Sequence, residues 1–445
     1  MFQRRRVRRD TVTPAPYVAS PSEEWEGNDG SWSTFRIHIG TPGQNFRVLP
    51  STAGSETWVP MPDGCTSRDP EDCPQQRGVE LFNGQSSRGF LWNESTTWTE
   101  TGLYTLDLEA SLGYEGHGHY GSDNVTLGST QDPGTLGLGR QIVAGIADTD
   151  YFLGIFGLGI RPVSFSSSAS TLSSFLVNAY NQSLIPSLSY GYTAGAPYRL
   201  KRVLGNLVLG GYDSSRFNPS LLSFSFAEED SRALTVGIQS IIASNTLLGV
   251  ASFTPKGHLS VIDSTVPDIW LPRDACDLMA EAFGLTYDEL TELYVINDTM
   301  RSKMQQLKPS ITFKLGNTAY DNGNSTNIVL PYAAFDLQAR WPYYKNPTNY
   351  FPIRRAANDS QYTLGRTFLQ EAYLIVDHER TNFTVNQATF LDPTSAAQIV
   401  TINPINSKSP SSTNLSGGAI GGIVAGAVVL LLAGAIAIWF FRFRK

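Results

Sequence analysis

The sequence predicts an all-β, bilobal protein followed by one C-terminal transmembrane helix, and three observations support this fold class. In a chain of 445 residues, 40 glycines and 25 prolines accompany only 16% charged residues, a balance that favours short strands joined by turns. One segment of the chain occurs twice, which indicates two related halves. An uncharged apolar run close to the C-terminus is long enough to cross a membrane.

The repeated segment defines the two halves. The stretch "PSTAGSETWVP" at residues 50–60 aligns with "IDSTVPDIWLP" at residues 262–272, at an offset of 212 residues. In this alignment Ser51 matches Asp263, and a Trp and a Pro recur at the same spacing. A second pair follows nearly in register, because Gly157 and Gly365 each end an apolar-apolar-Gly motif at a similar distance downstream. Two related halves imply a bilobal protein with a pseudo-twofold axis.

We expect six segments along the chain. They are an extended basic arm (1–31), an N-terminal lobe (32–215), a C-terminal lobe (216–392), a Ser/Asn/Pro stalk (393–418), a transmembrane helix (419–441) and a short basic tail (442–445). Inside the lobes, helical spacing predicts helices over "STLSSFLVNAYNQSL" and "RDACDLMAEAFG". A capping box from Thr286 to Glu289 predicts a further helix directly after the second of these.

The uncharged run at residues 419–441 predicts the membrane anchor. At about 1.5 Å rise per residue, a helix of this length spans a roughly 30 Å hydrocarbon core. The basic "RFRK" that follows it places the tail in the cytoplasm and the body in the lumen or outside the cell. The glycines at 418, 422 and 426 have the four-residue spacing at which two such helices approach closely, so a homodimer is one expectation.

Asn-x-Ser/Thr sequons support a glycoprotein of the secretory pathway, at the cell surface or in an internal membrane. The first residues, "MFQRRRVRRD", carry a positive cluster with no apolar stretch behind it, so they are not a signal peptide. Two alternatives remain: a true N-terminus upstream of this sequence, or insertion as a tail anchor, which leaves the body cytosolic. The eight candidate glycosylation sites are Asn93, Asn124, Asn181, Asn297, Asn324, Asn358, Asn382 and Asn414.

Charge and cysteine content restrict the classes of partner, disulfide and metal site that we expect. The net charge is -7, and the body between the two basic ends is about -15, which disfavours nucleic acid as a partner. Cys65 and Cys73 enclose a short Pro-containing loop that one disulfide could staple in an oxidising compartment. Cys276 has the helical spacing of a buried, inert thiol. No Cys/His pattern suits zinc, and we expect neither a metal nor a cofactor.

At the repeated segments the chain resembles the pepsin-like aspartic protease family, and its fungal members in particular. In that family each lobe has an apolar-apolar-Asp-Thr/Ser-Gly loop, which a distant apolar-apolar-Gly closes. The stretches "FRIHIGTPGQNFRVLP", "GIFGLGIRPVSF", "LGNLVLGGYDSSRF" and "YTLGRTFLQEAYLIVDHERTNFTVNQA" are similar to further family segments. The resemblance covers Trp32 to Ala388 and implies a bilobal pepsin-like fold whose interlobe cleft takes a peptide or protein.

The resemblance also implies the functional positions. The two catalytic aspartates of the family fall at positions 51 and 263, where this chain has Ser51 and Asp263. The small glycine of each loop is replaced by Ala53 and Thr265. Tyr114 is the candidate for the tyrosine of the flap that covers the substrate. Cys65 and Cys73 match the first-lobe disulfide of the family, and Cys276 matches one half of a second-lobe bridge.

The expected chemistry needs two carboxyl groups a few ångströms apart, one protonated and one ionised, which together hold the attacking water. A Ser hydroxyl does not accept a proton at physiological pH, and general acid–base catalysis alone is worth about 10² to 10⁴ in rate. The sequence therefore predicts a catalytically impaired member of the family that binds a ligand in its cleft. The alternatives are an active acid endopeptidase with a non-standard dyad and a purely structural or adhesive protein.

Other polar groups are weaker candidates. Glu56 and Asp268 stand five residues beyond the two loop positions, and a regular strand places them on the opposite face. We therefore do not expect them to replace the missing carboxylate. His117 and His119 fit an exposed loop better than a metal site.

Overall fold

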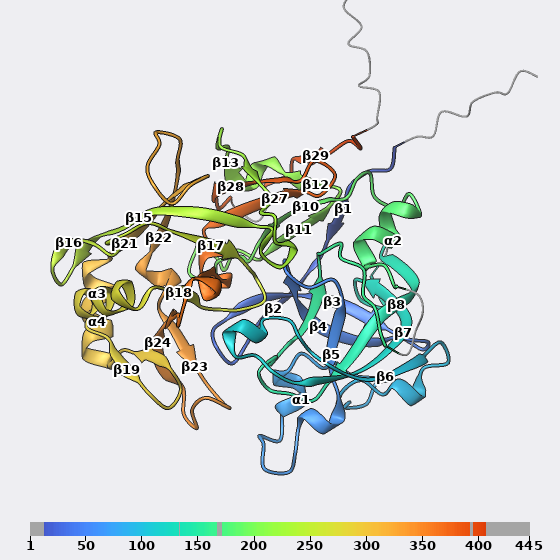
Figure 1. The fold of residues 1–445 in the computed structure, drawn as a ribbon. Helices are drawn as coiled ribbons and strands as arrows, with labels where there is room; N and C mark the ends of the chain where they lie inside the picture. Colours follow the sequence, from blue (N-terminus) through green and yellow to red (C-terminus); the bar gives the residue numbers. More distant parts are fainter. Residues whose placement is uncertain (1–12, 133, 167–170, 392–394, 406–445) are drawn as a thin grey trace, which may run out of the picture. The chain divides into compact units, whose positions relative to one another are not determined.

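The computed structural model describes residues 13–405 apart from 133, 167–170 and 392–394, and the fold of residues 13–403 is given below (Figure 1). The N-terminal half of the chain forms one sheet of eight strands. In spatial order they are β2 (Pro21–Glu26), β3 (Trp32–Ile39), β4 (Gln44–Ser51), β9 (Gly154–Gly157), β5 (Thr57–Pro60), β8 (Leu136–Ile146), β7 (His117–Leu127) and β6 (Thr99–Thr105).

The C-terminal half forms a second eight-stranded sheet and a smaller four-stranded one. The larger sheet contains β22 (Thr326–Pro331), β21 (Ser310–Gly316), β15 (Thr235–Thr246), β17 (His258–Ile262), β26 (Thr363–Leu364), β18 (Ile269–Leu271) and β25 (Ile353–Arg355), with β16 (Gly249–Ser252) paired to β15. The smaller sheet contains β19 (Thr286–Asp288), β20 (Leu293–Val295), β24 (Thr348–Phe351) and β23 (Leu337–Ala339).

A fourth sheet is built from both halves and joins the lobes (Figure 1). Its central contact is the antiparallel pair β10–β27, in which Gly191 lies opposite Ile375. Its strands are β1 (Tyr17–Ala19), β11 (Asn206–Leu209), β10 (Ser189–Thr193), β27 (Ala372–Asp377), β28 (Asn382–Ala388) and β13 (Phe217–Asn218), with β14 (Phe224–Ser225) paired to β28. A two-stranded sheet of β12 (Gly211–Asp213) and β29 (Ile399–Thr401) completes the described strands.

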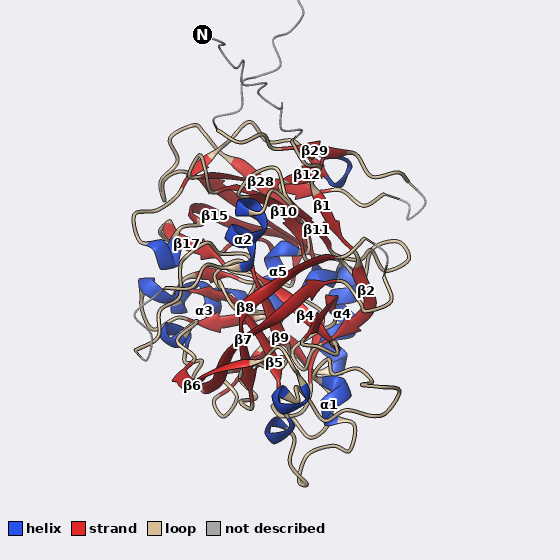
Figure 2. Cartoon of the chain, turned by 90° about the vertical axis from the view of Figure 1, so that its right-hand side faces the viewer, coloured by secondary structure: helices blue, strands red, loops and turns tan. Residues whose placement is uncertain are grey.

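Short helices pack around these sheets (Figure 2). In α3 (Arg273–Phe283) the side chains of Cys276, Met279 and Phe283 are buried, and Gly284 ends the helix with a φ of 68°, a conformation that glycine adopts without strain. The α-helices are α1 (Cys73–Gln76), α2 (Phe175–Asn181), α3 (Arg273–Phe283), α4 (Asp298–Leu307) and α5 (Arg366–Leu369). The 3₁₀ helices are η1 (Pro62–Gly64), η2 (Trp92–Glu94), η3 (Ala110–Leu112), η4 (Ser214–Arg216), η5 (Asp230–Arg232), η6 (Tyr332–Ala334) and η7 (Asp359–Gln361).

The internal repeat corresponds to one strand motif that occurs in each half. In the N-terminal half β4 runs parallel to β9, β9 antiparallel to β5, and β5 parallel to β8. In the C-terminal half β17 runs parallel to β26, β26 antiparallel to β18, and β18 parallel to β25. The mostly-β, bilobal architecture is therefore as the sequence predicts.

Three local expectations need correction. The described part of the arm is not separate from the fold, because β1 and β2 pair with strands of two sheets. The stalk begins later than residue 393, because β29 pairs with β12. Thr286 starts a strand that pairs with β20 instead of a helix, since Leu293 and Val295 offer it backbone partners.

The predicted transmembrane helix at 419–441 lies outside the described residues, as do the tail and the glycines at 418, 422 and 426. Within the described part of the chain, no helix has the length and apolar character that a membrane crossing requires.

Candidate functional site

Two loops from the two lobes meet at the ends of β4 and β17 and bind each other reciprocally. The backbone N–H of Thr52 donates to Oγ of Ser264 at 3.0 Å, and the N–H of Ser264 donates to Oγ1 of Thr52 at 3.0 Å. The Ser264 hydroxyl also donates to the Pro50 carbonyl at 2.6 Å. Because Thr52 and Ser264 are both buried, these bonds fix the two loops relative to each other.

Gly157 and Gly365 close the two loops from behind. In the parallel pairing of β4 with β9, Gly157 lies opposite Ser51. A Cβ at Gly157 would stand 2.6 Å from the backbone of Gly54 and Glu56, and a Cβ at Gly365 would stand 2.3 Å from the Asp268 carbonyl oxygen. Only glycine fits such a close approach of backbones, so the two halves share this constraint.

The Ser51 hydroxyl is occupied by structural hydrogen bonds. Its Oγ lies 2.7 Å from Oγ1 of Thr265 and accepts the N–H of Gly54 at 2.8 Å. Ser51 is fully buried. Thr265, which stands where the family has a small glycine, therefore contributes a hydroxyl partner to Ser51. The two departures from the family pattern thus contact each other.

Asp263 lies at the equivalent position of the second loop and is 1% exposed. Its Oδ1 accepts the N–H of Thr265 at 2.8 Å. No N–H or hydroxyl group of the described residues donates to its buried Oδ2. This oxygen is therefore the one that remains available to a further proton donor.

Arg366 holds the second loop through hydrogen bonds to its backbone carbonyl groups. Its guanidinium donates to the carbonyls of Ser264 and Thr265 at 3.1 and 2.6 Å and forms an ion pair with Asp29 at 3.1 Å. Asp29 belongs to the segment that the sequence assigns to the arm, so this segment helps to hold the site. No motif in the sequence indicated the contact.

A second carboxyl group reaches Asp263 from a segment that the sequence reasoning missed. Glu109 lies in the hairpin that connects β6 to β7. Burial, followed by the negative charge of the neighbouring Asp263, raises the pKa of the Glu109 carboxyl group well above its usual range. No sequence spacing could reveal this pair, because the path of the hairpin brings the two residues together.

The same hairpin, residues 106–116, crosses to the C-terminal lobe. Leu112 packs against Val266, Trp270 and Ala356 of that lobe. Nε2 of Gln361 donates to the Ser111 carbonyl. The hairpin therefore contacts both sides of the cleft.

Tyr114, the predicted flap residue, does lie on this hairpin. Its ring centroid is 5.6 Å from that of Tyr151, and it lines a cavity of only ≈ 20 Å³ together with Thr265 and Arg366. A larger cavity of ≈ 440 Å³ lies between the first loop and the β6 side of the hairpin, and it is lined by Ala53, Glu56, Trp58, Tyr104, Leu108, Tyr120, Arg161 and Phe165 among others. The larger of these two cavities therefore lies on the β6 side of the hairpin.

Glu56 and Asp268 have structural partners of their own. Oε2 of Glu56 accepts from Nε1 of Trp58 at 2.7 Å and from the Tyr120 hydroxyl at 2.8 Å. Asp268 forms a buried ion pair with Arg354 at 2.7 Å. Burial raises the pKa of both carboxyl groups. Their partners give each of them a role in packing.

His117 and His119 lie in strand β7, which corrects the expected loop. The His119 ring packs against Trp92 and Trp98, with centroids 5.1 and 5.7 Å apart, and its Nε2 is 3.1 Å from Oε1 of Glu100. Among the described residues, no three His, Cys, Asp or Glu side chains are grouped as a metal ion would need.

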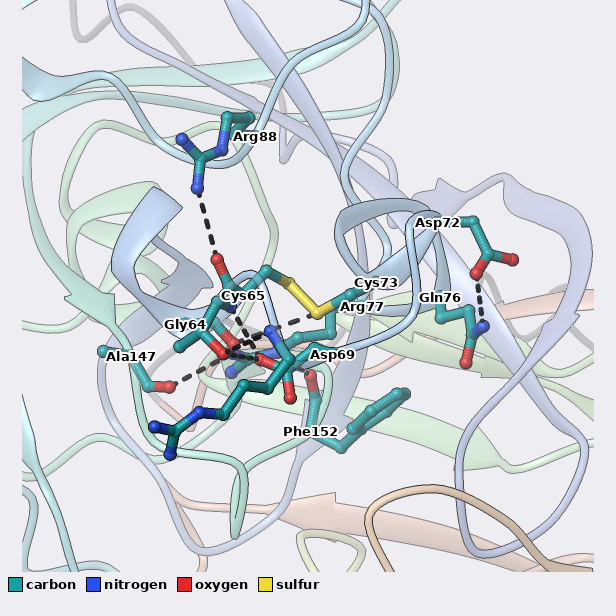
Figure 3. Close-up of a disulfide and its surroundings, with 12 residues drawn as sticks. Gly64, Cys65, Asp69, Asp72, Cys73, Gln76, Arg77, Arg88, Ala147 and Phe152 are labelled. Atoms are coloured by element: carbon teal, nitrogen blue, oxygen red, sulfur yellow. Dashed lines mark hydrogen bonds between the residues drawn. A yellow bond between two sulfur atoms is a disulfide. The ribbon is translucent and has the colours of Figure 1, made fainter. Parts of the chain in front are cut away.

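The predicted disulfide between Cys65 and Cys73 is present (Figure 3). Beside it lies the fully buried Arg77, whose guanidinium donates to the carbonyls of Gly64, Ala147, Asp148, Tyr151 and Phe152. Cys276 is a buried free thiol 3.3 Å from the Arg354 carbonyl, and burial raises its pKa to about 12.

Seven of the eight sequons fall within the described residues. Asn93, Asn181, Asn297, Asn324 and Asn358 are exposed. Asn124 and Asn382 lie in strands β7 and β28 and are partly buried. Asn414 lies outside the described residues.

Two lobes with the same strand motif, whose glycine-backed loops meet beneath a hairpin, define the class of bilobal acid proteases and their homologues. The sequence profile of the eukaryotic aspartyl proteases matches residues 34–389. The chain belongs to this family.

Relatives are similar at low identity. Secreted aspartic protease 1 of Candida albicans is 23% identical over 371 residues, which cover 82% of this chain and 83% of the relative. Aspartic proteinase 3 of Saccharomyces cerevisiae is 22% identical over 450 residues, covering 87% and 75%. Gastricsin of Cavia porcellus is 24% identical over 350 residues, covering 77% and 76%.

Proposed function

We propose that this chain is a membrane glycoprotein of the pepsin family that binds a peptide or another ligand in its interlobe cleft and has little or no peptidase activity. The observation that carries the proposal is the state of position 51. A hydroxyl group stands where the family has its first aspartate, and that hydroxyl is already held by Thr265 and Gly54. It neither accepts a proton nor faces the cleft as a free group.

The position of Glu109 does not make it a lasting partner for Asp263 once a ligand is bound. Hydrolysis requires a carboxyl pair that stays together while the substrate lies across it. Glu109 belongs to the flap, which lies above Asp263. A peptide that enters between the flap and Asp263 separates the two carboxyl groups, so the pair is absent when the reaction needs it.

The cavity beside the flap is suited to an apolar side chain of a bound peptide. Trp58, Tyr104, Tyr120 and Phe165 give it aromatic walls, and Arg161 adds a cationic group. Glu56, Asp107, Ser55, Thr105 and Ser164 also line the cavity, so its walls combine aromatic surface with polar groups that can orient a ligand.

A second candidate function is acid endopeptidase activity, and the proximity of Glu109 to Asp263 is the observation that favours it. Two carboxyl groups sharing a proton are the chemical requirement of the family. In this alternative Glu109 replaces the missing aspartate from the opposite side of the cleft.

The experiment that separates the two functions is cleavage of a denatured protein by the purified full-length chain between about pH 3 and pH 6. The proposed function predicts no turnover, and it predicts that Ser51→Asp combined with Ala53→Gly restores cleavage. Turnover that both Asp263→Asn and Glu109→Gln abolish would instead establish the enzyme.

The membrane and glycoprotein parts of the proposal are tested in the native host. We expect the protein in the membrane fraction, and we expect endoglycosidase treatment to increase its electrophoretic mobility. An unchanged mobility would contradict the luminal or extracellular placement and would favour a cytosolic, tail-anchored protein.

A further inference from the structure

A separate cavity lies on the C-terminal lobe, and all of its lining residues belong to that lobe. It measures ≈ 940 Å³, against ≈ 440 Å³ for the cavity beside the first loop. Its walls are η5 with the residues before it (227–232), the turn before β17 (253–258), the start of α3 (272–275) and η7 (359–362). Because Gln361 of η7 also donates to the Ser111 carbonyl of the hairpin 106–116, the cavity adjoins the cleft without being part of it.

Hydrogen bonds within the C-terminal lobe hold these walls in place. The Arg232 guanidinium donates to the carbonyls of Ser360 and Tyr362, which ties η5 to η7. The N–H of Val261 in β17 donates to the Tyr362 carbonyl at 3.0 Å. The Tyr362 ring packs against the His258 ring, with centroids 4.9 Å apart. The cavity is therefore preformed, which lowers the entropic cost of binding.

His258 is a polar group of this wall that lacks a partner. The residue is 8% exposed, and neither ring nitrogen forms a hydrogen bond of normal geometry with the residues that the structure describes. Burial lowers its pKa to about 4, and the Lys256 backbone offsets only part of this shift. At neutral pH the ring is therefore uncharged, with one donor and one acceptor nitrogen. Buried polar groups are usually paired, so His258 is a group that a bound molecule can satisfy.

Negative charge surrounds the cavity. Within the described part of the chain, none of the four carboxylates that line it forms an ion pair. Of the two lining cations, Arg232 is already bonded to two carbonyls, and Lys256 is exposed. The four carboxylates, all exposed, are Glu228, Glu229, Asp274 and Asp359.

Side chains of arginine and lysine match this lining. Their charged ends form strong hydrogen bonds with carboxylates, and their aliphatic stems cover apolar surface of the kind that Pro255, Leu259 and Pro272 contribute. The Tyr362 ring adds an aromatic face for a cation. A peptide also brings backbone N–H and C=O groups, which suit a neutral His258 better than a simple cation does.

We propose that this cavity is an exosite, a binding site outside the cleft, which holds a basic segment of a peptide or protein. In it, arginine or lysine side chains pair with the four carboxylates, and the backbone of the segment bonds to His258. The exosite rests on the proposed function, because it selects among the peptides and proteins that the cleft binds by the charge of a second segment.

The test is the binding of dye-labelled hexa-arginine to the full-length chain, measured by fluorescence anisotropy at pH 7 and about 0.15 M salt, where long-range attraction to the acidic body is screened. Endoglycosidase treatment beforehand keeps a glycan on Asn358 away from Asp359. We expect hexa-arginine to bind and hexa-citrulline, which has the same shape without the charge, not to bind. Equal binding of the two peptides would overturn the inference.

Matched variants locate the binding. Asp274→Asn combined with Asp359→Asn should weaken hexa-arginine binding about three- to tenfold, because two exposed ion pairs are lost. Glu71→Gln combined with Glu289→Gln removes the same charge at exposed positions outside the cavity and should leave the affinity unchanged. An equal loss in both double variants would mean attraction to the acidic surface at large and would overturn the exosite.

His258→Phe tests the unpartnered ring. It keeps an aromatic ring against Tyr362 and removes both nitrogens, so it should weaken hexa-arginine binding about threefold or more. Unchanged affinity would contradict the role of His258. The two proposals also fail separately: cleavage of a denatured protein would overturn the proposed function and leave the exosite, whereas binding of neutral peptides without hexa-arginine would overturn the exosite alone.

Discussion

At position 51 a hydroxyl replaces a carboxylate without leaving a gap. Ser51 Oγ satisfies both Thr265 and the N–H of Gly54, so the loop geometry survives although the reacting group is lost. The reciprocal bonds between Thr52 and Ser264 beside it are intact. The replacement at position 51 thus removes the reacting carboxylate while the hydrogen bonds that hold the two loops remain.

We expect Ser51→Ala to lower the free energy of unfolding by about 1–3 kcal/mol, because it leaves two buried groups without a partner. Urea unfolding followed by tryptophan fluorescence measures this change. The control is Ser55→Ala in the same loop, whose buried hydroxyl has no hydrogen-bond partner within the described structure, and it should leave the unfolding midpoint unchanged. An equal loss in both variants would mean that the bonds of Ser51 contribute nothing.

The sequence predicts the residues of the two loops but not their partners. Ser51, Asp263 and the closing glycines follow from the internal repeat, because strand motifs and tight backbone approaches leave a periodic signature. Glu109 and Arg366 leave none, since their contacts depend on the path of a hairpin and of a short helix between distant segments. Thr265 departs from the family pattern in the sequence, but only the structure shows it as the partner of Ser51.

Among the elements, the loop closed by Cys65 and Cys73 is stabilised by an arginine as well as by the disulfide. Arg77 has no exposed surface and no carboxylate contact among its hydrogen bonds, and burial lowers its pKa to about 10. Five backbone carbonyls from two separate loops compensate for this burial. The arginine therefore ties the segment that follows α1 to the turn before β9.

Arg77→Met should destabilise the protein by more than about 3 kcal/mol, because it leaves several buried carbonyls without donors. Thermal unfolding measured by circular dichroism gives the change. Arg88→Met is the matched control, since Arg88 is exposed and its one hydrogen bond to the residues that the structure describes is with the Cys65 carbonyl at 3.3 Å. Comparable melting temperatures for the two variants would contradict this role of Arg77.

The sequence predicts the helices correctly where apolar residues recur with strong helical periodicity. α2 and α3 lie within the predicted helices, because their apolar residues recur on one face. At Thr286 the sequence predicts a helix where a strand forms, since a short polar segment pairs or coils according to its neighbours and the four-residue capping pattern is common by chance. Strands β1, β2 and β29 have no clear sequence pattern, because pairing with neighbouring strands and not their own side chains makes them strands.

For the molecule as a whole, stability at acid pH is set in part by buried histidine. His258 is 8% exposed, and burial lowers its pKa to about 4. In the unfolded chain a histidine titrates near 6.5. Its contribution to stability is therefore complete above pH 6.5 and is lost as the pH falls through 4, and it amounts to about 3 kcal/mol between pH 7 and pH 4.

We expect His258→Leu to remove this part of the pH dependence, so that unfolding free energies at pH 7 and pH 4 differ by about 3 kcal/mol less than in the unmodified chain. Urea titrations at the two pH values provide the comparison. His117→Leu, at an exposed position of β7, should leave the difference as it is. If His258→Leu retained the full acid sensitivity, other groups would have to account for it.

The sheet shared by both halves also constrains how the protein is made. Strand β10 of the first half pairs with β27, which lies near the end of the folded region. During synthesis, the first half therefore leaves the ribosome before β27 can cover that edge of its sheet. An unpaired edge is a template for aggregation. We therefore expect that neither half folds stably on its own. A chain truncated before residue 372 should depend on chaperones or be degraded instead of persisting as a free lobe.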